Sequence, residues 1–254
     1  MKNVLSKEGI KRYLVSSLDV EAYDSVTSTN DLAKDMAKSG AKDVLLVARE
    51  QTKGRGRFAR KFYSPKDAGV YFSLIIEPTC KEETAYITPM CAVAAADAIR
   101  AVCEKNALIK WVNDIYIEQK KCVGILCEGV SSHGAEIDRV VCGIGVNIRP
   151  KDGGVDEEIK DVAGFVGEKD DVSNLLVATI CDNLMRLHES FDEHYISSRY
   201  KEMSMLIGKR VEVSKFDESK PAVVRNIDEK CRLVVVYDNG SVETLDVGDV
   251  RIKI

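Results

Sequence analysis

The sequence lacks the segments and residue patterns that mark secreted, membrane-spanning or zinc-binding proteins. Its N-terminus, MKNVLSKEGIKRYL, has neither the apolar core nor the cleavage site of a signal peptide. The longest apolar run, around Met90 to Ala96, is far shorter than the roughly 20 residues that cross a bilayer. No Cys-x-x-Cys pair occurs, and the three histidines have no metal-ligand spacing with the eight cysteines. These absences predict a soluble, cytoplasmic protein with reduced thiols and no metal site.

An excess of positive charge is also missing. The chain has 37 basic and 41 acidic residues, a net charge of −4, whereas nucleic-acid-binding proteins are usually basic. Its hydrophobic share of 45% and charged share of 31% are ordinary for a soluble globular protein. Cysteines such as Cys91 in MCAVAAA and Cys142 in VVCGIGV are expected to act as small buried hydrophobes. The sequence therefore predicts no nucleic-acid partner. It also predicts a hydrophobic core that is stable without disulfide bonds or a structural metal.

The order of apolar segments predicts an α+β fold. The residues at 28–31, Ser-Thr-Asn-Asp, have the spacing of a helix cap, and Gly40 is expected to end that helix. Strands are predicted at 43–48, 69–76, 107–111 and 139–148, a hairpin at 115–130, and helices at 28–40, 84–106 and 171–203.

The pattern changes after about Leu206. Four short strands, KRVEVS, PAVVRNI, CRLVVVY and SVETLDV, alternate with turn residues, including the hairpin signal Asn239-Gly240. We therefore expect a mixed α+β domain at 1–205 and a small all-β domain at 206–254.

The most unusual segment is 49–66, REQTKGRGRFARKFYSPK. It carries seven basic residues and one acid, a net charge of +6. Glycines at 54 and 56 let backbone amides approach a ligand closely, and arginines offer bidentate donors to phosphate or carboxylate. The segment therefore suits a polyphosphate, although a solvated charged face would have the same composition. Gly54, Gly56 and Ala59 also fit G-x-G-x-x-A, but no helix is expected to follow them, and no G-x-x-x-x-G-K-[ST] loop occurs.

Two further segments combine strand ends with polar residues or glycine. Lys110 ends the strand at 107–111, just before an Asn-Asp turn, where it can meet an anion or be simply solvated. Gly124 and the two glycines of GIGVNI (143–148) mark places where a ligand or another backbone comes close, or where a strand bulges or packs tightly.

Taken in order, these segments resemble the biotin–protein ligase family. The family pattern is STN, GRGRxxRxW, KWPND, KxxGIL and G-x-G-x-N. Here it reads STN (28–30), GRGRFARKF (54–62), KWVND (110–114), KCVGIL (121–126) and GIGVN (143–147). The resemblance implies a biotin/lipoate-ligase fold with an SH3-like C-terminal β-barrel. It also implies a homodimer formed through a sheet edge. Only 27 residues precede Ser28, too few for the helix-turn-helix domain of the bifunctional members, so a monofunctional type is expected.

The resemblance also implies residue roles. Activity would be formation of biotinyl-5′-AMP from biotin and ATP, with Mg²⁺ on the triphosphate, and transfer to a lysine of a biotin carboxyl carrier protein. Arg57 and Lys110 would be catalytic, Arg57 retaining biotinyl-AMP and Lys110 bridging carboxylate and phosphate. Biotin would be bound by Ser28, Thr29, Asn30, Gln51, Arg55, Gly56, Arg57, Lys110 and Gly124. The nucleotide would be bound by Gly54, Arg55, Arg57, Arg60, Phe62, Asn113, Lys121 and Asn147.

Two positions depart from the family pattern. Val112 replaces the proline of KWPND, so the backbone at this position loses its fixed φ. Phe62 replaces the tryptophan expected to cover adenine, and its ring offers a smaller aromatic area. Two alternatives stay open: a lipoate or octanoate ligase or transferase of the same fold, and a degenerate non-enzymatic homologue. The biotin carrier itself is excluded, because the only Met-Lys is Met1-Lys2. A nucleic-acid-binding barrel is disfavoured, because 206–254 holds nine basic and nine acidic residues.

Overall fold

The computed structural model describes residues 5–131, 134, 136–151, 153–157, 159–167, 172–215, 218–246 and 250–253. For Ala59 and residues 250–252 it describes the backbone only.

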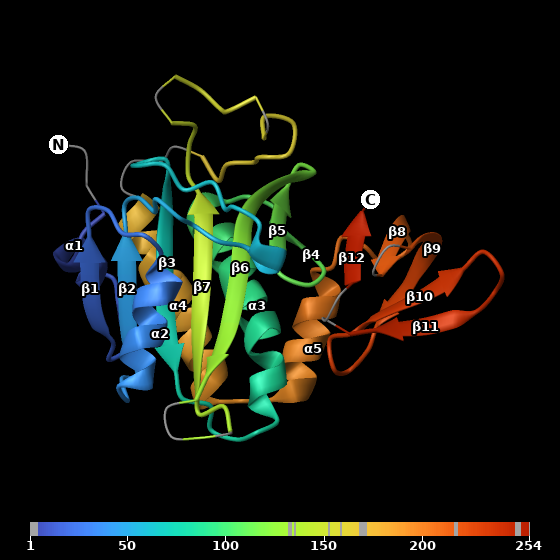
Figure 1. Ribbon diagram of the computed structural model, residues 1–254, viewed down its shortest axis with the longest axis horizontal. Helices are drawn as coiled ribbons and strands as arrows, with labels where there is room; N and C mark the ends of the chain where they lie inside the picture. The colour runs from blue at the N-terminus through green and yellow to red at the C-terminus, as the bar shows by residue number, and fades with distance from the viewer. Residues whose placement is uncertain are drawn as a thin grey trace.

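Within these residues the larger unit is a seven-stranded mixed sheet in the order β1-β2-β3-β7-β6-β5-β4 (Figure 1). The first two strands pair in parallel and the other neighbours are antiparallel. Helix α2 covers one face, and α3 and α4 cover the other. The strands are β1 (Asp19–Tyr23), β2 (Val44–Ala48), β3 (Gly69–Ile76), β4 (Leu108–Lys110), β5 (Asp114–Ile117), β6 (Lys120–Val130) and β7 (Arg139–Asn147). The helices are α1 (Lys7–Lys11), α2 (Thr29–Lys38), η1 (Arg57–Ala59), α3 (Glu83–Cys103), α4 (Val172–Glu189) and α5 (Glu193–Glu202).

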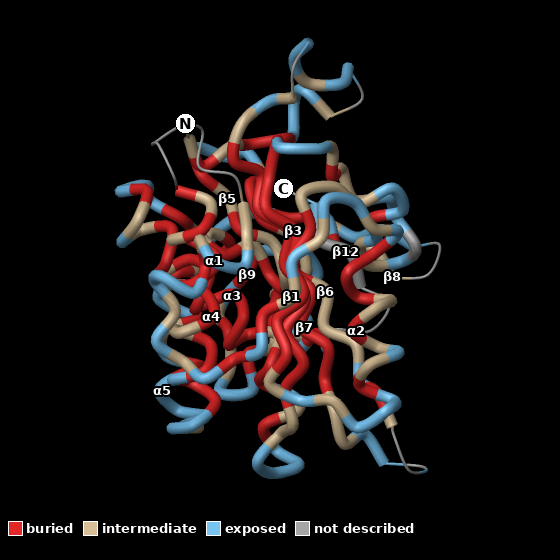
Figure 2. Tube along the Cα trace, turned by 90° about the vertical axis from the view of Figure 1, so that its left-hand side faces the viewer, coloured by how far each residue is buried: buried red, intermediate tan, exposed pale blue. Residues whose placement is uncertain are grey.

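The core lies between the sheet and the α3–α4 layer. Every residue of β3 is buried, and β7 is buried after its first residue, as the red central strands of Figure 2 show. Helix α3 is rich in buried alanine, which lets it pack closely against α4 and the sheet. Its length and composition would also suit a membrane span, but most of it is buried inside the protein, and core helices of soluble proteins share this character.

The second unit is a five-stranded antiparallel sheet in the order β11-β10-β9-β8-β12, within the described residues. It contacts the first unit through side chains of the turn after β4 and of α3. Trp111 Nε1 donates to the carbonyl of Cys231 at 2.9 Å, and the hydroxyl of Tyr86 donates to the carbonyl of Glu229 at 3.0 Å. Its strands are β8 (Arg210–Lys215), β9 (Glu218–Ile227), β10 (Leu233–Tyr237), β11 (Val242–Leu245) and β12 (Val250–Lys253).

The structure confirms most of the predicted elements, divides one predicted helix and adds elements that were not predicted. Ser28 caps α2 as expected, and Gly240 has a φ of 82° in the turn between β10 and β11. The helix predicted at 171–203 is two helices, because Asp192 accepts from two backbone amides and starts α5. Strands β1 and β12 and the short helices α1 and η1 were not predicted. The α+β class with a small C-terminal β unit is confirmed.

A buried ion pair joins α3 to α4. Glu83 is fully buried, and one of its carboxylate oxygens lies 2.5 Å from Nδ1 of His188. The other accepts from the backbone amide and hydroxyl of Thr79 at 2.6 and 2.8 Å. Burial opposes ionisation of Glu83, but the hydrogen bonds from His188 and Thr79 lower its pKa overall. The bond to Glu83 raises the pKa of His188 against its own burial.

We expect His188→Gln to remove part of the pH dependence of stability. The pKa of His188 is raised from 6.5, so its stabilising contribution is complete below that pH and is lost as the pH rises through the raised pKa. The pKa of Glu83 is lowered from 4.5, so its contribution is lost as the pH falls through the lowered pKa. Measured with urea, the free energy of unfolding of the wild type should fall on the alkaline side by on the order of 1–3 kcal/mol. The free energy of unfolding of the variant should not show this fall.

The matched control is His194→Gln, because His194 is exposed on α5. It should keep the alkaline loss of stability seen in the wild type. An alkaline loss of the same size in His188→Gln would contradict the expectation.

Candidate functional site

One cavity of about 360 Å³ opens on the face of the sheet that carries α2. Its floor comes from β6 and β7, one wall from the start of α2, a second from the basic loop at 51–62, and a third from the turn after β4. Segments far apart in sequence therefore meet around one space.

The start of α2 is fixed by a buried hydrogen-bond network. Gln51 accepts from the backbone amide of Thr29 at 2.9 Å and from its hydroxyl at 3.2 Å. The hydroxyl of Ser73 lies 2.8 Å from that of Thr29 and 2.6 Å from Oδ1 of Asn30. Nδ2 of Asn30 donates to the carbonyl of Leu126 at 3.1 Å. Thr29, Asn30 and Ser73 are buried and partnered, so the polar wall is held in place before any ligand arrives.

The glycines of GIGVN receive side chains from other segments. A Cβ added at Gly143 would lie 2.0 Å from Oδ1 of Asn30, and one at Gly145 would lie 2.3 Å from the ring of Phe62. A Cβ at Gly124 would also meet that ring, at 2.7 Å. The sequence marked these glycines as places of close approach, and in the structure the approaching groups are Asn30 and Phe62.

The basic loop places Arg57 inside the cavity. Its guanidinium is half-buried, lies 4.9 Å from the ring centre of Phe58 and donates to Oδ1 of Asn113 at 3.5 Å. Burial lowers the pKa of Arg57, and the carboxylate of Asp114 opposes this shift. Arg55 lies nearer the rim, where it pairs with Asp31.

Lys110 reaches the cavity from the end of β4. Burial lowers the pKa of Lys110, Asp114 raises it and Lys121 lowers it further. Its Nζ lies 5.3 Å from the ring centre of Tyr116. Asp114 is also 2.6 Å from Nζ of Lys121. Both lysines therefore face the same space, and one carboxylate stands between them.

The turn after Lys110 is held from two directions. The Trp111–Val112 peptide bond is cis, and the carbonyl of Val112 accepts from the hydroxyl of Tyr200 in α5 at 2.8 Å. Trp111 is fixed by its bond to the carbonyl of Cys231. Val112 is 2% exposed, so the position that departs from the family pattern is buried in the core.

The structure places most of the predicted site residues on the cavity wall and two of them outside it. Gly54 packs against Ser64 and Phe62 and shapes the loop, and Asn147 donates to the carbonyl of Gly164 at 3.2 Å. Predicted residues on the wall are Ser28, Thr29, Asn30, Gln51, Arg55, Gly56, Arg57, Arg60, Phe62, Lys110, Asn113, Lys121 and Gly124. Lining residues that were not predicted include Phe58, Lys61, Phe72, Trp111, Asp114, Tyr116, Leu126, Gly143, Gly145 and Val162.

The charge of the wall is strongly one-sided. Among the described lining residues, Asp114 is the only carboxylate. The cationic lining residues are Arg55, Arg57, Arg60, Lys61, Lys110 and Lys121. In a protein of net charge −4, this concentration of positive charge suits an anionic ligand.

Most of the cavity wall lies within a stretch of the chain that matches a known protein family. Residues 22–147 match the biotin/lipoate A/B protein ligase family, and the chain belongs to this family.

Individual relatives agree with this assignment. The bifunctional ligase/repressor BirA of Bacillus spizizenii is 35% identical over 159 residues, which are 60% of this chain and 49% of that protein. The chain thus spans about half the length of this relative. The biotin–[acetyl-CoA-carboxylase] ligase of Mycobacterium tuberculosis is 24% identical over 92% of this chain and 88% of its own.

A solved structure extends the likeness over the whole fold. The biotin protein ligase of Aquifex aeolicus, in complex with biotin and ATP, superposes with a TM-score of 0.76 at 23% identity. The match covers 92% of this chain and 98% of that one.

Proposed function

We propose that the protein is an ATP-dependent ligase that activates biotin as biotinyl-5′-AMP and transfers it to a lysine of a biotin carboxyl carrier protein. The observation that carries this proposal is the cavity itself, where Lys110 and Arg57 face a preformed polar wall at the start of α2. Relatives named biotin–[acetyl-CoA-carboxylase] ligase and a related structure holding biotin and ATP support it.

The first step joins two anions. A carboxylate oxygen of biotin bonds to the α-phosphorus of ATP, and the bond from that phosphorus to the leaving pyrophosphate breaks. Lys110 and Arg57 reduce the repulsion between the two reactants and stabilise the charge that develops on the phosphoryl oxygens. Because both are half-buried, their charges act through a lower effective dielectric than in water.

We assign the two ends of the cavity to the two substrates. Biotin lies against Ser28, Thr29, Asn30 and Gln51, beneath the loop that carries Arg55 and Gly56, with its carboxylate toward Lys110. The nucleotide lies toward Arg60, Asn113 and Lys121, with Phe62 beside the base. Gly54 and Asn147 act from outside the wall, by shaping the basic loop and by holding the segment near Gly164.

Magnesium would enter with the triphosphate, whose oxygens are the hard ligands that it prefers. Asp114 is the only carboxylate among the described lining residues, and its partner is Lys121. This wall suits an ion held mainly by the nucleotide and not a protein cage.

The second step passes the acyl group to the carrier. The ε-amine of the carrier lysine attacks the acyl carbon, an amide bond forms, AMP leaves and the amine loses a proton. We propose that 1–205 carries the chemistry and that 206–254 is the SH3-like domain that helps to dock nucleotide or carrier. A homodimer would use an outer edge of the large sheet. The main chain at Met203–Met205 covers β4, so we assign the contact to β1.

Biotin-dependent exchange between ATP and pyrophosphate tests the first step. Purified protein should catalyse exchange with biotin and not with lipoate or octanoate. Exchange with lipoate or octanoate alone would move the protein to the neighbouring activity within the family. No exchange with any of the three acids would support a non-enzymatic homologue.

A further inference from the structure

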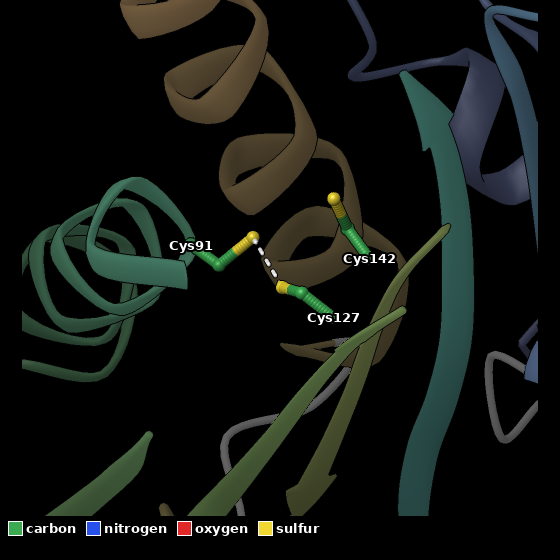
Figure 3. Close-up of side chains that lie close together, drawn as sticks. All are labelled: Cys91, Cys127 and Cys142. Atoms are coloured by element: carbon green, nitrogen blue, oxygen red, sulfur yellow. Dashed lines mark hydrogen bonds between the residues drawn. The ribbon is translucent and has the colours of Figure 1, made fainter. Parts of the chain in front are cut away.

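Three cysteines from different elements meet behind the floor of the cavity. Cys91 lies on α3, Cys127 on β6 and Cys142 on β7, and their side chains gather between α3 and the sheet (Figure 3). The sulfur atoms of all three lie within 4.8 Å of one another, and those of Cys91 and Cys127 are 3.8 Å apart. Cys127 and Cys142 are cross-strand partners, so the sheet itself fixes two members of the cluster.

The spacing of the sulfur atoms suits a single small ion. Three sulfurs bound at about 2.3 Å from one ion stand roughly 3.8–4.0 Å apart, depending on how flat the arrangement is. One pair already has this separation, and the others need to close by less than about 1 Å, which side-chain rotation provides.

The donor set selects the kind of ion. The cluster consists of three sulfur ligands, and no histidine or carboxylate among the described residues completes it. Magnesium, calcium and manganese prefer oxygen, and structural zinc sites take four ligands. Soft thiolates select monovalent copper, which three sulfurs can satisfy.

We propose that Cys91, Cys127 and Cys142 form a binding site for one monovalent copper ion, which the three sulfurs coordinate alone. Each copper–sulfur bond replaces a thiol proton or uses a sulfur lone pair, so binding releases protons and needs no oxidant. Cys127 is half-buried whereas its two partners are fully buried, so the ion enters past Cys127.

The position of the cluster links it to the cavity on the opposite face of the sheet. Leu126 precedes Cys127, Gly143 follows Cys142, and both line the cavity. Asn30 donates to the carbonyl of Leu126 and lies against Gly143. An ion that draws the cysteines together pulls on β6 and β7 where Asn30 rests. We therefore expect copper to weaken biotin binding, an expectation that rests on the proposed function, whereas the copper site itself does not.

The test is an anaerobic titration of the full chain with monovalent copper against the chromophoric chelator bicinchoninate, without biotin. We expect one copper per chain, with only sulfur neighbours in its X-ray absorption spectrum. Cys91→Ala, Cys127→Ala and Cys142→Ala should each weaken copper binding by at least about 100-fold. Loss of a residue that only orients a metal ligand typically weakens binding by up to about 100-fold, and loss of a ligand itself should cost at least as much. Cys181→Ala, equally buried in α4, and Cys80→Ala, which is exposed, are the controls and should bind copper as the wild type does.

Three outcomes would overturn the site: no uptake of copper, uptake that survives in the three cluster variants, or nitrogen or oxygen among the copper neighbours. Tighter binding of zinc than of copper would also overturn it, because zinc requires a fourth ligand. The effect on the cavity is measured separately, as the biotin-induced rise in unfolding temperature with and without copper. If copper binds but that rise is unchanged, the link to the cavity fails and the copper site stands.

Discussion

Lys110→Ala should lower the rate of biotin-dependent ATP–pyrophosphate exchange by on the order of 10²–10³-fold, or about 2.7–4 kcal/mol of transition-state stabilisation. Lys110 is half-buried, and apart from Arg57 and Lys121 no described cation of the cavity wall is as enclosed. Removing its charge leaves the carboxylate and the phosphate to approach each other without a bridging cation. Alanine also leaves the partly buried Asp114 with Lys121 as its remaining partner.

The matched control is Lys120→Ala. Lys120 is exposed at the start of β6, and its Nζ donates to the carbonyl of Lys160 at 3.3 Å, away from the cavity. This variant should exchange pyrophosphate at the wild-type rate. Unchanged exchange in Lys110→Ala would remove that lysine from the reaction, and equal losses in both variants would indicate a general effect of charge.

Gly143→Ala should abolish biotin binding and destabilise the fold. The new Cβ would lie 2.0 Å from Oδ1 of Asn30, which is too short for any non-bonded contact, so the Asn30 side chain has to move. Asn30 must therefore leave its hydrogen bonds to Leu126, Glu128 and Ser73. Overpacking of a tight core site costs roughly 1–3 kcal/mol, and the unpaired buried amide costs roughly 1–3 kcal/mol more. Urea unfolding and calorimetric biotin titration measure the two effects.

A double-mutant cycle separates the clash from other consequences of the substitution. Asn30→Ala removes the amide that the new methyl would meet, so Gly143→Ala should cost less stability in that background than in the wild type. The double variant should still fail to bind biotin, because Asn30 is missing from the wall. Equal costs of Gly143→Ala in both backgrounds would show that the clash with Asn30 is not the cause.

Local signals in the sequence were sufficient for most of the fold. The cap at Ser28, the wholly buried strand at 69–76 and the Asn-Gly turn before β11 depend on neighbours in sequence, and all three are confirmed. Strand β1 was not predicted because only Val20 of its five residues is buried, so it has no apolar run. The break between α4 and α5 had a signal that was overlooked, since Asp192 is a typical helix cap.

The sequence predicted which segments line the cavity, but not which side chains meet there. Basic residues and glycines marked the segments that meet at the cavity, but the partners of those glycines come from distant parts of the chain. Nothing near Gly143 in sequence indicates Asn30, and nothing near Gly145 indicates Phe62. The cysteine cluster was missed for the same reason, because positions 91, 127 and 142 have no local spacing pattern and meet only when α3 packs on the sheet.

Trp111 gives the protein a built-in optical reporter. It is the only tryptophan in the chain, it lines the cavity, and its indole nitrogen is bonded to the carbonyl of Cys231 in the second sheet. Its emission therefore comes from one known place and not from an average over several. A ligand that enters the cavity and a displacement of the C-terminal sheet both change the surroundings of this ring. Unlabelled protein can thus be followed by fluorescence while ligand binding and the attachment of the two sheets are examined in the same sample.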